Sequence, residues 1–279
     1  MREIEMQAEP TQISDSHTSK GNQLKWEQDG YWYKADAFGY ESLAEVVCSN
    51  ILMHSNLPRP VCYEPVTIIY HGKRYRGCRS KNFKKENESL IPIERLCRQY
   101  TGMGLARTLA RFADVRERIL YTVDLITNIT GLTEFNRYLT QMLELDAFFL
   151  NEDRHTNNIA VLYDETIREY RLCPFFDMGL ALLADTTQDY PPGADVETCL
   201  AKVQAKPFDR DFDEQLDAAN ALYGCFLKFE WNVQQMCAEL GRIVDEGNYT
   251  AEECRRVECL LRNQARKYAY LIPSCEAPG

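Results

Sequence analysis

A cluster of polar side chains lies between two apolar stretches near the middle of the sequence. Residues 149–162 read FLNEDRHTNNIAVL, and the six residues from Asp153 to Asn158 include one acid, two basic side chains and two amides. A carboxylate can receive the proton of a reacting hydroxyl, and an amide oxygen suits Mg²⁺, which prefers oxygen ligands. The cluster therefore contains side chains of the kind that transfer of a phosphoryl group from ATP requires.

A second acid follows this cluster after a predicted hairpin. Asp177 begins the turn DMG, 24 positions after Asp153. Two strand-like runs, NIAVLY and REYRLCPFF, lie between them and are joined at residues 164–166, so the chain is expected to return to the same end of a cleft. In protein kinases, a base and a metal-binding amide have the D-x-x-x-x-N spacing of Asp153 and Asn158, and a second carboxylate starts a turn after a hairpin. The polar cluster is therefore interpreted as a catalytic loop.

A lysine and a glutamate earlier in the sequence are of the remaining types that phosphoryl transfer from ATP requires. Lys34 ends the aromatic, strand-favouring run GYWYKAD, and Glu45 lies inside the following helical run, YESLAEVVCSNILMHSNLP. A lysine held by a glutamate can bind nucleotide phosphates. Glu41 is an alternative partner, because it lies on the same helix face one turn earlier. Glu45 is favoured because it lies deeper in the apolar helix, where an ion pair would be shielded from water.

This combination resembles the HipA-like kinases, in particular the compact forms that consist of the kinase portion alone. The resemblance spans roughly residues 17–270. Within DRHTNN, the family's signature is an acid, a His two positions later and an Asn five positions later, which here are Asp153, His155 and Asn158. It continues in CPFFDMG, which is similar to the family's approach to its metal-binding Asp. TSKGNQLKW resembles the family's Ser/Gly phosphate loop, and GYESLAEVV resembles its helix with the lysine-pairing Glu.

The resemblance implies a serine/threonine protein kinase that uses ATP and Mg²⁺. It implies Asp153 as the base, and Asn158 and Asp177 as the metal ligands. It also implies Lys34 as the residue that binds the phosphates, with Glu45 as its partner.

Two parts of the expected site differ from ordinary protein kinases. The G-x-G-x-x-G loop is absent, and only Gly21 and Gly30 precede the strand lysine. Phosphate contacts are therefore expected from the backbone around Thr18, Ser19 and Gly21. His155 stands where many protein kinases have a lysine, and it is expected to orient the base, to touch a phosphate or to brace the loop.

The predicted fold is α+β, a bilobal protein-kinase-like fold with a small β-rich N-lobe and a larger helical C-lobe. Residues 1–22 are polar and are expected to be a mobile N-terminal segment. Residues 23–88 combine one helix with strand-like runs, including an alternating run around His71-Gly72 that predicts a hairpin. They are expected to form the N-lobe. Residues 89–279 are dominated by helical periodicity and are expected to form the C-lobe, with the catalytic loop and the metal-binding turn.

Composition excludes several classes of function. The net charge of −10 and the pI of about 5.1 argue against nucleic acid as a direct partner, because such binding depends on a basic surface. The 11 cysteines contain no C-x-x-C pair, which favours reduced thiols over a structural metal. The first 23 residues lack an apolar core, and no run approaches the ~18 apolar residues of a membrane span. A cytoplasmic protein without a membrane partner is expected.

The leading hypothesis is an ATP-dependent serine/threonine protein kinase that acts on a protein of unknown identity and also on itself. Ser14, Ser16, Thr18 and Ser19 offer hydroxyls beside the expected phosphate loop. Phosphate added there would repel the phosphates of the nucleotide, which predicts inhibition.

Two alternatives use the same residues. DRHTNN is also similar to the D-R-H-x-x-N loop of phosphoinositide kinases, although the chain is short for a lipid kinase and lacks a basic patch for anionic head groups. The other alternative is a catalytically inactive kinase-fold binding module. Some HipA-like kinases are toxins held by a helix-turn-helix antitoxin. Because the compact form is expected here, without the additional N-terminal domain of longer members, that partner is not favoured.

Overall fold

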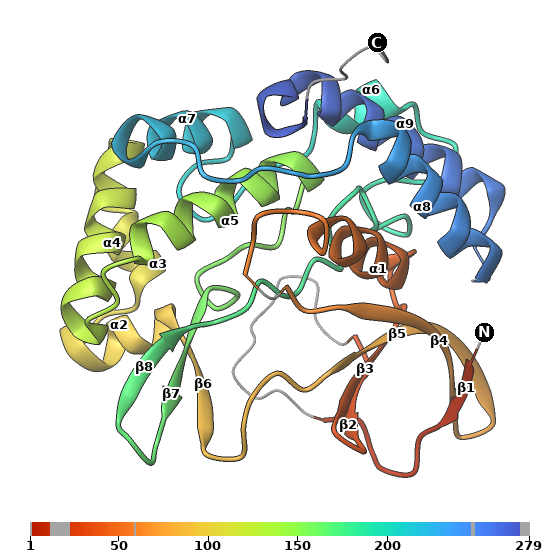
Figure 1. The fold of residues 1–279 in the computed structure, drawn as a ribbon, viewed down its shortest axis with the longest axis horizontal. Coiled ribbons are helices and arrows are strands. Elements are labelled where there is room, and N and C mark those ends of the chain that lie inside the picture. Colours follow the sequence, from red (N-terminus) through yellow and green to blue (C-terminus); the bar gives the residue numbers. More distant parts are fainter. Residues whose placement is uncertain (1, 12–22, 59, 247–248, 274–279) are drawn as a thin grey trace. The chain divides into compact units, whose positions relative to one another are not determined.

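The fold is described from a computed structural model of the 279-residue chain, in which residues 2–11, 23–58, 60–246 and 249–273 are described (Figure 1). The chain forms two compact units. Unit 1 comprises Met1–Asn82, Phe176–Val203 and Leu227–Gly279, and unit 2 comprises Phe83–Phe175 and Gln204–Phe226.

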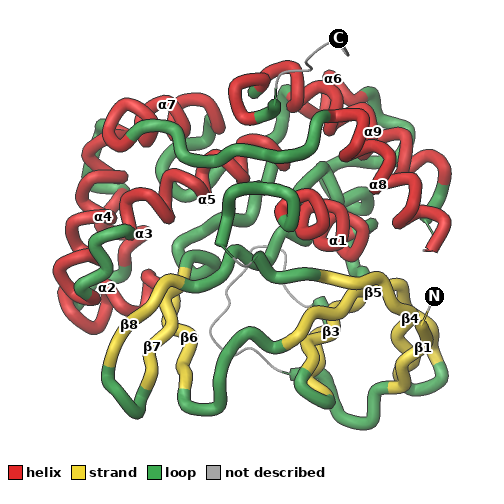
Figure 2. The backbone as a smooth tube through the Cα atoms, viewed as in Figure 1, coloured by secondary structure: helices red, strands yellow, loops and turns green. Residues whose placement is uncertain are grey.

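Unit 1 is built on a five-stranded sheet (Figure 2). Its strands are β1 (Arg2–Glu5), β2 (Lys25–Gln28), β3 (Tyr31–Ala35), β4 (Tyr63–Tyr70) and β5 (Lys73–Lys81). They lie in the order β1-β4-β5-β3-β2, and only the β1–β4 pair is parallel. Asp29-Gly30 and His71-Gly72 all have positive φ angles, which two-residue hairpin turns favour. The hairpin predicted at His71-Gly72 is confirmed.

The two faces of this sheet have different neighbours. One face carries an apolar cluster that includes Trp26, Tyr33 and Ile68. The helix α1 (Glu41–Leu52) packs against β4 and β5, and every α1 residue except Asn50 is buried. A helix that is buried on all sides must be covered by further elements as well as by the sheet.

The elements that cover α1 come from later in the chain, and Figure 1 shows α8 (Val233–Glu246) beside α1. Next to α8 lies α9 (Ala251–Lys267), and unit 1 also contains α6 (Val196–Leu200) and the 3₁₀ helix η1 (Ala269–Leu271). Tyr40 Oη, at the start of α1, donates to Leu182 O at 2.6 Å. These contacts explain why unit 1 includes residues 176–203 and 227–279, whereas the expected lobe boundary lies between residues 88 and 89.

The N-terminal residues correct one expectation. The sequence predicted a mobile segment over residues 1–22, but Arg2–Glu5 form β1, which pairs with Val66–Ile69 of β4. Residues 12–22 of that segment lie outside the described residues. The Met6 side chain is buried in the apolar cluster, and Ile4 packs against it. A short strand with three polar residues gives little signal by itself, because its stability comes from pairing with a distant strand.

Unit 2 contains a three-stranded antiparallel sheet and five helices among its described residues. The strands are β6 (Glu88–Pro92), β7 (Ala160–Asp164) and β8 (Glu169–Leu172), in that order. The helices are α2 (Ile93–Thr101), α3 (Leu105–Leu109), α4 (Val115–Thr130), α5 (Phe135–Phe149) and α7 (Phe212–Tyr223). The predicted β7–β8 hairpin is confirmed, and Asp164 Oδ1 accepts from the Thr166 and Ile167 amides in its turn. The core helix α5 packs against α4 and α7.

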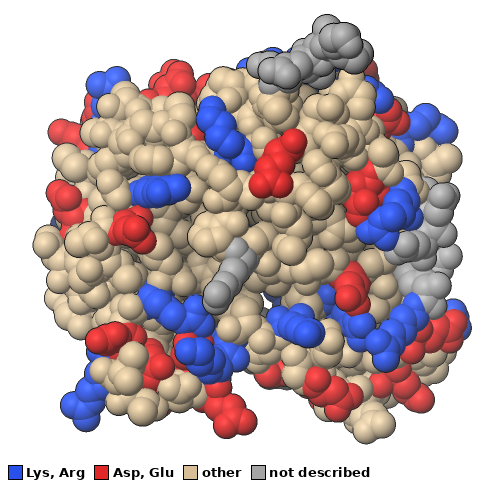
Figure 3. Space-filling view, in the orientation of Figure 1, with Lys and Arg blue, Asp and Glu red and all other residues tan. Residues whose placement is uncertain are grey.

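Charges of both signs are common on the surface. Figure 3 shows Lys and Arg side chains interspersed with Asp and Glu over much of the face in view. Among the residues that the structure describes, none of the helices combines the length and the apolar composition that a bilayer span needs.

Candidate active site

The strand lysine lies at the centre of an ion cluster in unit 1. Lys34 Nζ donates to Glu45 Oε1 and, at 2.6 Å, to Asp177 Oδ1. Lys34 comes from β3 and Glu45 from the middle of α1, which covers the sheet, while Asp177 begins the DMG turn. The ion pair expected between Lys34 and Glu45 is present. Two close carboxylates offset the cost of removing an ammonium group from water.

Glu45 also holds the turn that carries Asp177. Its second oxygen, Oε2, accepts from the backbone N–H of Met178 at 3.0 Å. A Cβ atom at Gly179 would lie 3.5 Å from Glu45 Oε1, so the turn passes close to this carboxylate. One glutamate therefore fixes both the lysine and the backbone of the DMG turn.

Glu41, the alternative partner, has a different role. Its carboxylate accepts from the backbone N–H groups of Ala37, Phe38 and Gly39 at 2.7–3.0 Å. It therefore satisfies the turn that leads into α1. The choice of Glu45 for the lysine agrees with the geometry, since Glu45 lies one helical turn further in.

Asp177 has a backbone conformation that is uncommon for residues other than glycine. Its φ angle is +63°, in the left-handed region that few residues other than glycine adopt. Such conformations persist where surrounding contacts impose them, often at functional sites. Lys25 Nζ also lies 3.9 Å from Asp177 Oδ1, so two cations face one carboxylate oxygen.

The charge state of Lys34 follows from its surroundings. Burial by itself would lower the pKa of Lys34, but the negative charges of Asp177 and Glu45 outweigh burial and raise the pKa well above its ordinary value. The lysine therefore stays protonated at any physiological pH. The ring of Tyr63 also lies against it, with Nζ 5.2 Å from the ring centroid.

The loop of unit 2 that contains Asp153 and Asn158 is anchored by a buried ion pair. Arg154 donates from Nε to Asp146 Oδ2 at 2.9 Å and from Nη2 to Asp146 Oδ1 at 3.1 Å. Arg154 Nη1 also donates to Asn158 O at 3.0 Å, and Asn151 Nδ2 donates to Asp146 Oδ1 at 2.8 Å. The last turn of α5 thus holds both sides of the loop. Sequence reasoning missed this role, although Asp146 interrupts the apolar stripe of α5, which was a usable signal.

The two loop residues with the D-x-x-x-x-N spacing contact each other directly. Asn158 Nδ2 donates to Asp153 O at 2.8 Å and to Asp153 Oδ2 at 3.3 Å. This orientation leaves the Asn158 amide oxygen pointing away from Asp153 as a candidate metal ligand.

Two basic side chains approach the carboxylate of Asp153. His155 Nε2 lies 3.8 Å and Lys206 Nζ 3.6 Å from Asp153 Oδ1. The other ring nitrogen of His155, Nδ1, accepts from the Asn157 N–H at 3.2 Å. His155 therefore braces the loop and also faces the acid.

Some expected site residues cannot be placed. Thr18, Ser19 and Gly21, the expected phosphate-loop residues, lie outside the described residues. Lys34, Glu45 and Asp177 belong to unit 1, whereas Asp153, His155 and Asn158 belong to unit 2. Within the described ranges, no group of three or more His, Cys, Asp or Glu side chains is placed to hold a metal ion.

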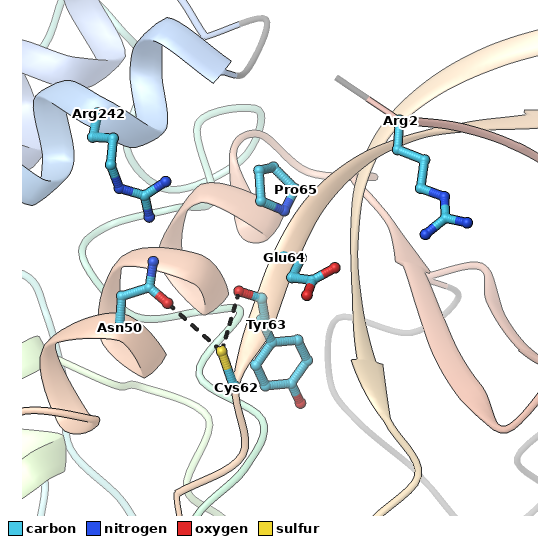
Figure 4. A pocket seen from close by; sticks show the side chains of 7 residues that line it. All are labelled: Arg2, Asn50, Cys62, Tyr63, Glu64, Pro65 and Arg242. Carbon is cyan, nitrogen blue, oxygen red and sulfur yellow. Dashed lines mark hydrogen bonds between the residues drawn. The ribbon is translucent and has the colours of Figure 1, made fainter.

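Unit 1 also contains a separate pocket of about 540 Å³ (Figure 4). Its lining residues are Arg2, Asn50, Cys62, Tyr63, Glu64, Pro65 and Arg242. Glu64 forms an ion pair with Arg79, and Arg242 forms one with Glu239, so these two charges already have partners. Tyr63 links the pocket to the lysine through its ring. None of the site residues expected from the sequence lines this pocket.

Comparison with known proteins gives a structural relative. No protein-family model and no curated protein matches the sequence. The structure is similar to the crystal structure of a proinflammatory kinase, CtkA, from Helicobacter pylori. The TM-score is 0.57, with 15% sequence identity, and the match covers 95% of both chains. At this identity the likeness shows the fold. The expected α+β fold, with a β-sheet N-terminal region and a helical C-terminal region, is confirmed.

Proposed function

We propose that this chain is an ATP-dependent serine/threonine protein kinase of the HipA-like type, which uses Mg²⁺ and also phosphorylates itself. The observation that carries the proposal is the ion cluster of unit 1, in which Lys34 lies between Glu45 and Asp177. Placing these charges together away from water is unfavourable unless they are tightly paired, and an ordinary polar surface has no need of the arrangement. Its three members have the types and order that nucleotide phosphate binding requires.

The residues of unit 1 are proposed to bind the nucleotide and the metal ion. Two neighbouring carboxylates raise the pKa of Lys34, so it is charged, and its bond to Glu45 holds the ammonium group in position for a phosphate. When bound, Mg²⁺ neutralises charge on the phosphates and orients them. We assign Asp177 and Asn158 as its protein ligands. Asp177 Oδ1 already faces an ammonium group at 2.6 Å, so it is oriented toward a position where positive charge is stabilised.

The catalytic loop of unit 2 is proposed to act on the acceptor hydroxyl. Asp153 receives the hydroxyl proton while the oxygen bonds to the γ-phosphorus. The bond from that phosphorus to the β–γ bridging oxygen breaks, and ADP leaves. The buried pair of Asp146 and Arg154 holds the loop without touching the substrate.

Autophosphorylation is proposed to regulate the enzyme. Ser14, Ser16, Thr18 and Ser19 are the candidate acceptors, and all four lie outside the described residues. Phosphate near the nucleotide's own phosphates would lower nucleotide affinity by charge repulsion. We further propose a cytoplasmic location and a protein substrate, without nucleic acid or a membrane as a direct partner.

The test is phosphate transfer by the purified chain. Wild-type protein is incubated with γ-labelled ATP and generic protein substrates, with Mg²⁺ or with a chelator, beside the variant Asp153→Asn. We expect Mg²⁺-dependent labelling that falls by roughly 10²- to 10⁴-fold in the variant, while its melting temperature and ATP binding stay unchanged. Labelling that is equal in both proteins would remove Asp153 from the reaction. A wild type that binds ATP without transferring phosphate would instead identify an inactive binding module.

A lipid kinase is the second candidate, supported by the D-R-H-x-x-N spacing of the catalytic loop. The same labelled ATP is supplied with vesicles that contain phosphoinositides, and with vesicles that lack them. Labelled lipid in the absence of labelled protein would reverse the order of the two candidates.

A further inference from the structure

We propose that Lys206 is a catalytic residue, whose ammonium group contacts the phosphoryl group while it is transferred at Asp153. This assignment rests on the proposed kinase function and adds a residue to it. Neither the spacing of the catalytic loop nor the metal-binding turn includes Lys206, which follows Asp153 by 53 positions.

The first argument is the position of the ammonium group. Lys206 Nζ lies 3.6 Å from Asp153 Oδ1, which is the distance of an ion pair rather than of a short hydrogen bond. The Lys206 side chain is 41% exposed and that of Asp153 is 13% exposed. A hydroxyl that gives its proton to Asp153 must come within about 3 Å of this carboxylate. The phosphorus that bonds to this hydroxyl therefore comes within reach of the same ammonium group.

The second argument is that the backbone around Lys206 is fixed. Lys206 belongs to the short segment before α7, and two of its neighbours, Ala205 and Phe208, are buried. Ala205 N donates to Arg210 O at 2.8 Å, which closes the turn. Arg118 Nη1, from α4, donates to Phe208 O at 2.5 Å. The lysine therefore extends from a rigid base, and a preorganised cation is more effective in catalysis than one that must be ordered.

The third argument is that His155 is engaged by its own loop, whereas Lys206 approaches Asp153 from a different segment. Many protein kinases have a lysine two positions after the base, and this chain has His155 there. His155 Nδ1 accepts a hydrogen bond from the Asn157 N–H at 3.2 Å, so this ring is engaged by the backbone of its own loop. Lys206 approaches the same carboxylate oxygen that His155 faces. We infer that His155 braces the loop and that Lys206 provides the cation.

The chemical role follows from the charges that change during transfer. As Asp153 takes the hydroxyl proton, the oxygen–phosphorus bond forms and the bond to the ADP oxygen breaks. Negative charge is spread over the oxygens of the moving phosphoryl group. An ammonium group beside Asp153 stabilises that charge and keeps its own proton. The atoms that move in the reaction are therefore the same with or without this lysine.

The experiment measures kcat and KM for ATP, together with the ATP dissociation constant, in full-length variants. Lys206→Met removes the charge, and Lys206→Arg keeps it. Lys202→Met, an exposed lysine four positions earlier, is the matched control. We expect Lys206→Met to lower kcat by roughly 10²- to 10³-fold with unchanged ATP affinity. Lys206→Arg should recover much of the rate, and Lys202→Met should equal the wild type.

A purely structural role would give a different pattern. It would lower the melting temperature of Lys206→Met, and Lys206→Arg would not restore the rate. Wild-type kcat in Lys206→Met, together with an inactive Asp153→Asn, would overturn the role of Lys206 and leave the kinase function intact. Loss of ATP binding with unchanged kcat would overturn it as well. A wild type without any transfer activity would overturn both proposals.

Discussion

Units 1 and 2 each contain a lysine or arginine paired with a buried acid, but the surroundings of the two pairs differ. In unit 1, Lys34 forms ion pairs with both Glu45 and Asp177, and the Asp177 side chain is 22% exposed to solvent. In unit 2, Arg154 and Asp146 are 1% and 0% exposed. The remaining Arg154 donor group binds the loop backbone at Asn158 O.

This difference teaches which charges can act on a ligand. A charge that reaches water can exchange its protein partner for a phosphate or a metal ion. A charge that is fully buried in an ion pair can only hold its neighbours in place. If it left its partner to bind a ligand, the partner would remain buried and unpaired, which is costly. Arg154 is therefore a positioning residue, although it lies inside the sequence motif between Asp153 and His155.

The largest expected effect comes from breaking the sealed pair in unit 2. Arg154→Met leaves Asp146 buried without its partner, and we expect a loss of about 3–5 kcal/mol in the free energy of unfolding. Phosphate transfer should fall as well, because the loop loses its bond to Asn158 O. Chemical denaturation and the transfer assay measure the two effects.

The double variant Asp146→Leu/Arg154→Met is the control for this prediction. Because both charges are removed together, it should be more stable than Arg154→Met alone. Equal destabilisation in the single and double variants would contradict the view that the unpaired Asp146 causes the loss.

An intermediate effect is expected from the accessible cluster in unit 1. Lys34→Met should weaken ATP binding by roughly 10- to 100-fold, the equivalent of one hydrogen bond to a charged group. Its unfolding free energy should fall less than that of Arg154→Met, because Asp177 reaches water and Glu45 keeps the Met178 N–H. Calorimetric titration with ATP and denaturation measure these quantities.

Lys73→Met serves as the matched control, since Lys73 is exposed in the same sheet at the β4–β5 hairpin. If Lys34→Met and the wild type bound ATP with equal affinity, the ion cluster would have no role in nucleotide binding.

The smallest expected effect concerns a third pair, which links the two outer strands of the small sheet. Glu88 on β6 accepts two hydrogen bonds of 2.6 Å from Arg171 on β8. Arg171 holds the pKa of Glu88 at about 2, below its ordinary value of 4.5. The pair therefore contributes stability above about pH 4.5 and loses it as the pH falls toward 2.

Glu88→Gln should remove this contribution. Because Arg171 is partly exposed, we expect about 1–2 kcal/mol at neutral pH, and the wild type and variant should converge near pH 2. Denaturation curves across this pH range measure it. A difference that stays constant from pH 7 to pH 2 would rule out ionisation of Glu88 as the cause.

Features that depend on neighbouring residues were accessible from the sequence. The turns at His71-Gly72 and at residues 164–166 follow from local turn chemistry, and the helix with Glu45 follows from its apolar periodicity. Glu45 is preferred over Glu41 because it lies deeper in the apolar helix; both are buried, and backbone N–H groups before α1 bind Glu41 while Lys34 binds Glu45.

Features that depend on distant partners were not accessible. The first strand has a polar sequence, and its place in the sheet comes from pairing with the distant residues Val66–Ile69. Lys206 belongs to neither sequence motif, and only the folded chain brings its ammonium group to 3.6 Å from Asp153 Oδ1. Asp146 interrupts the apolar stripe of α5, which marks it as unusual, but only the folded chain shows that its partner is Arg154, eight positions later.

The sequence by itself determined the kinds of side chains available and their order, because the spacing within loops, turns and helices is set by local backbone geometry. The tertiary structure alone decided which of those charges face water and which are sealed. Burial and ion pairing depend on surfaces contributed by remote segments, and the same aspartate can be a ligand or an anchor according to what covers it.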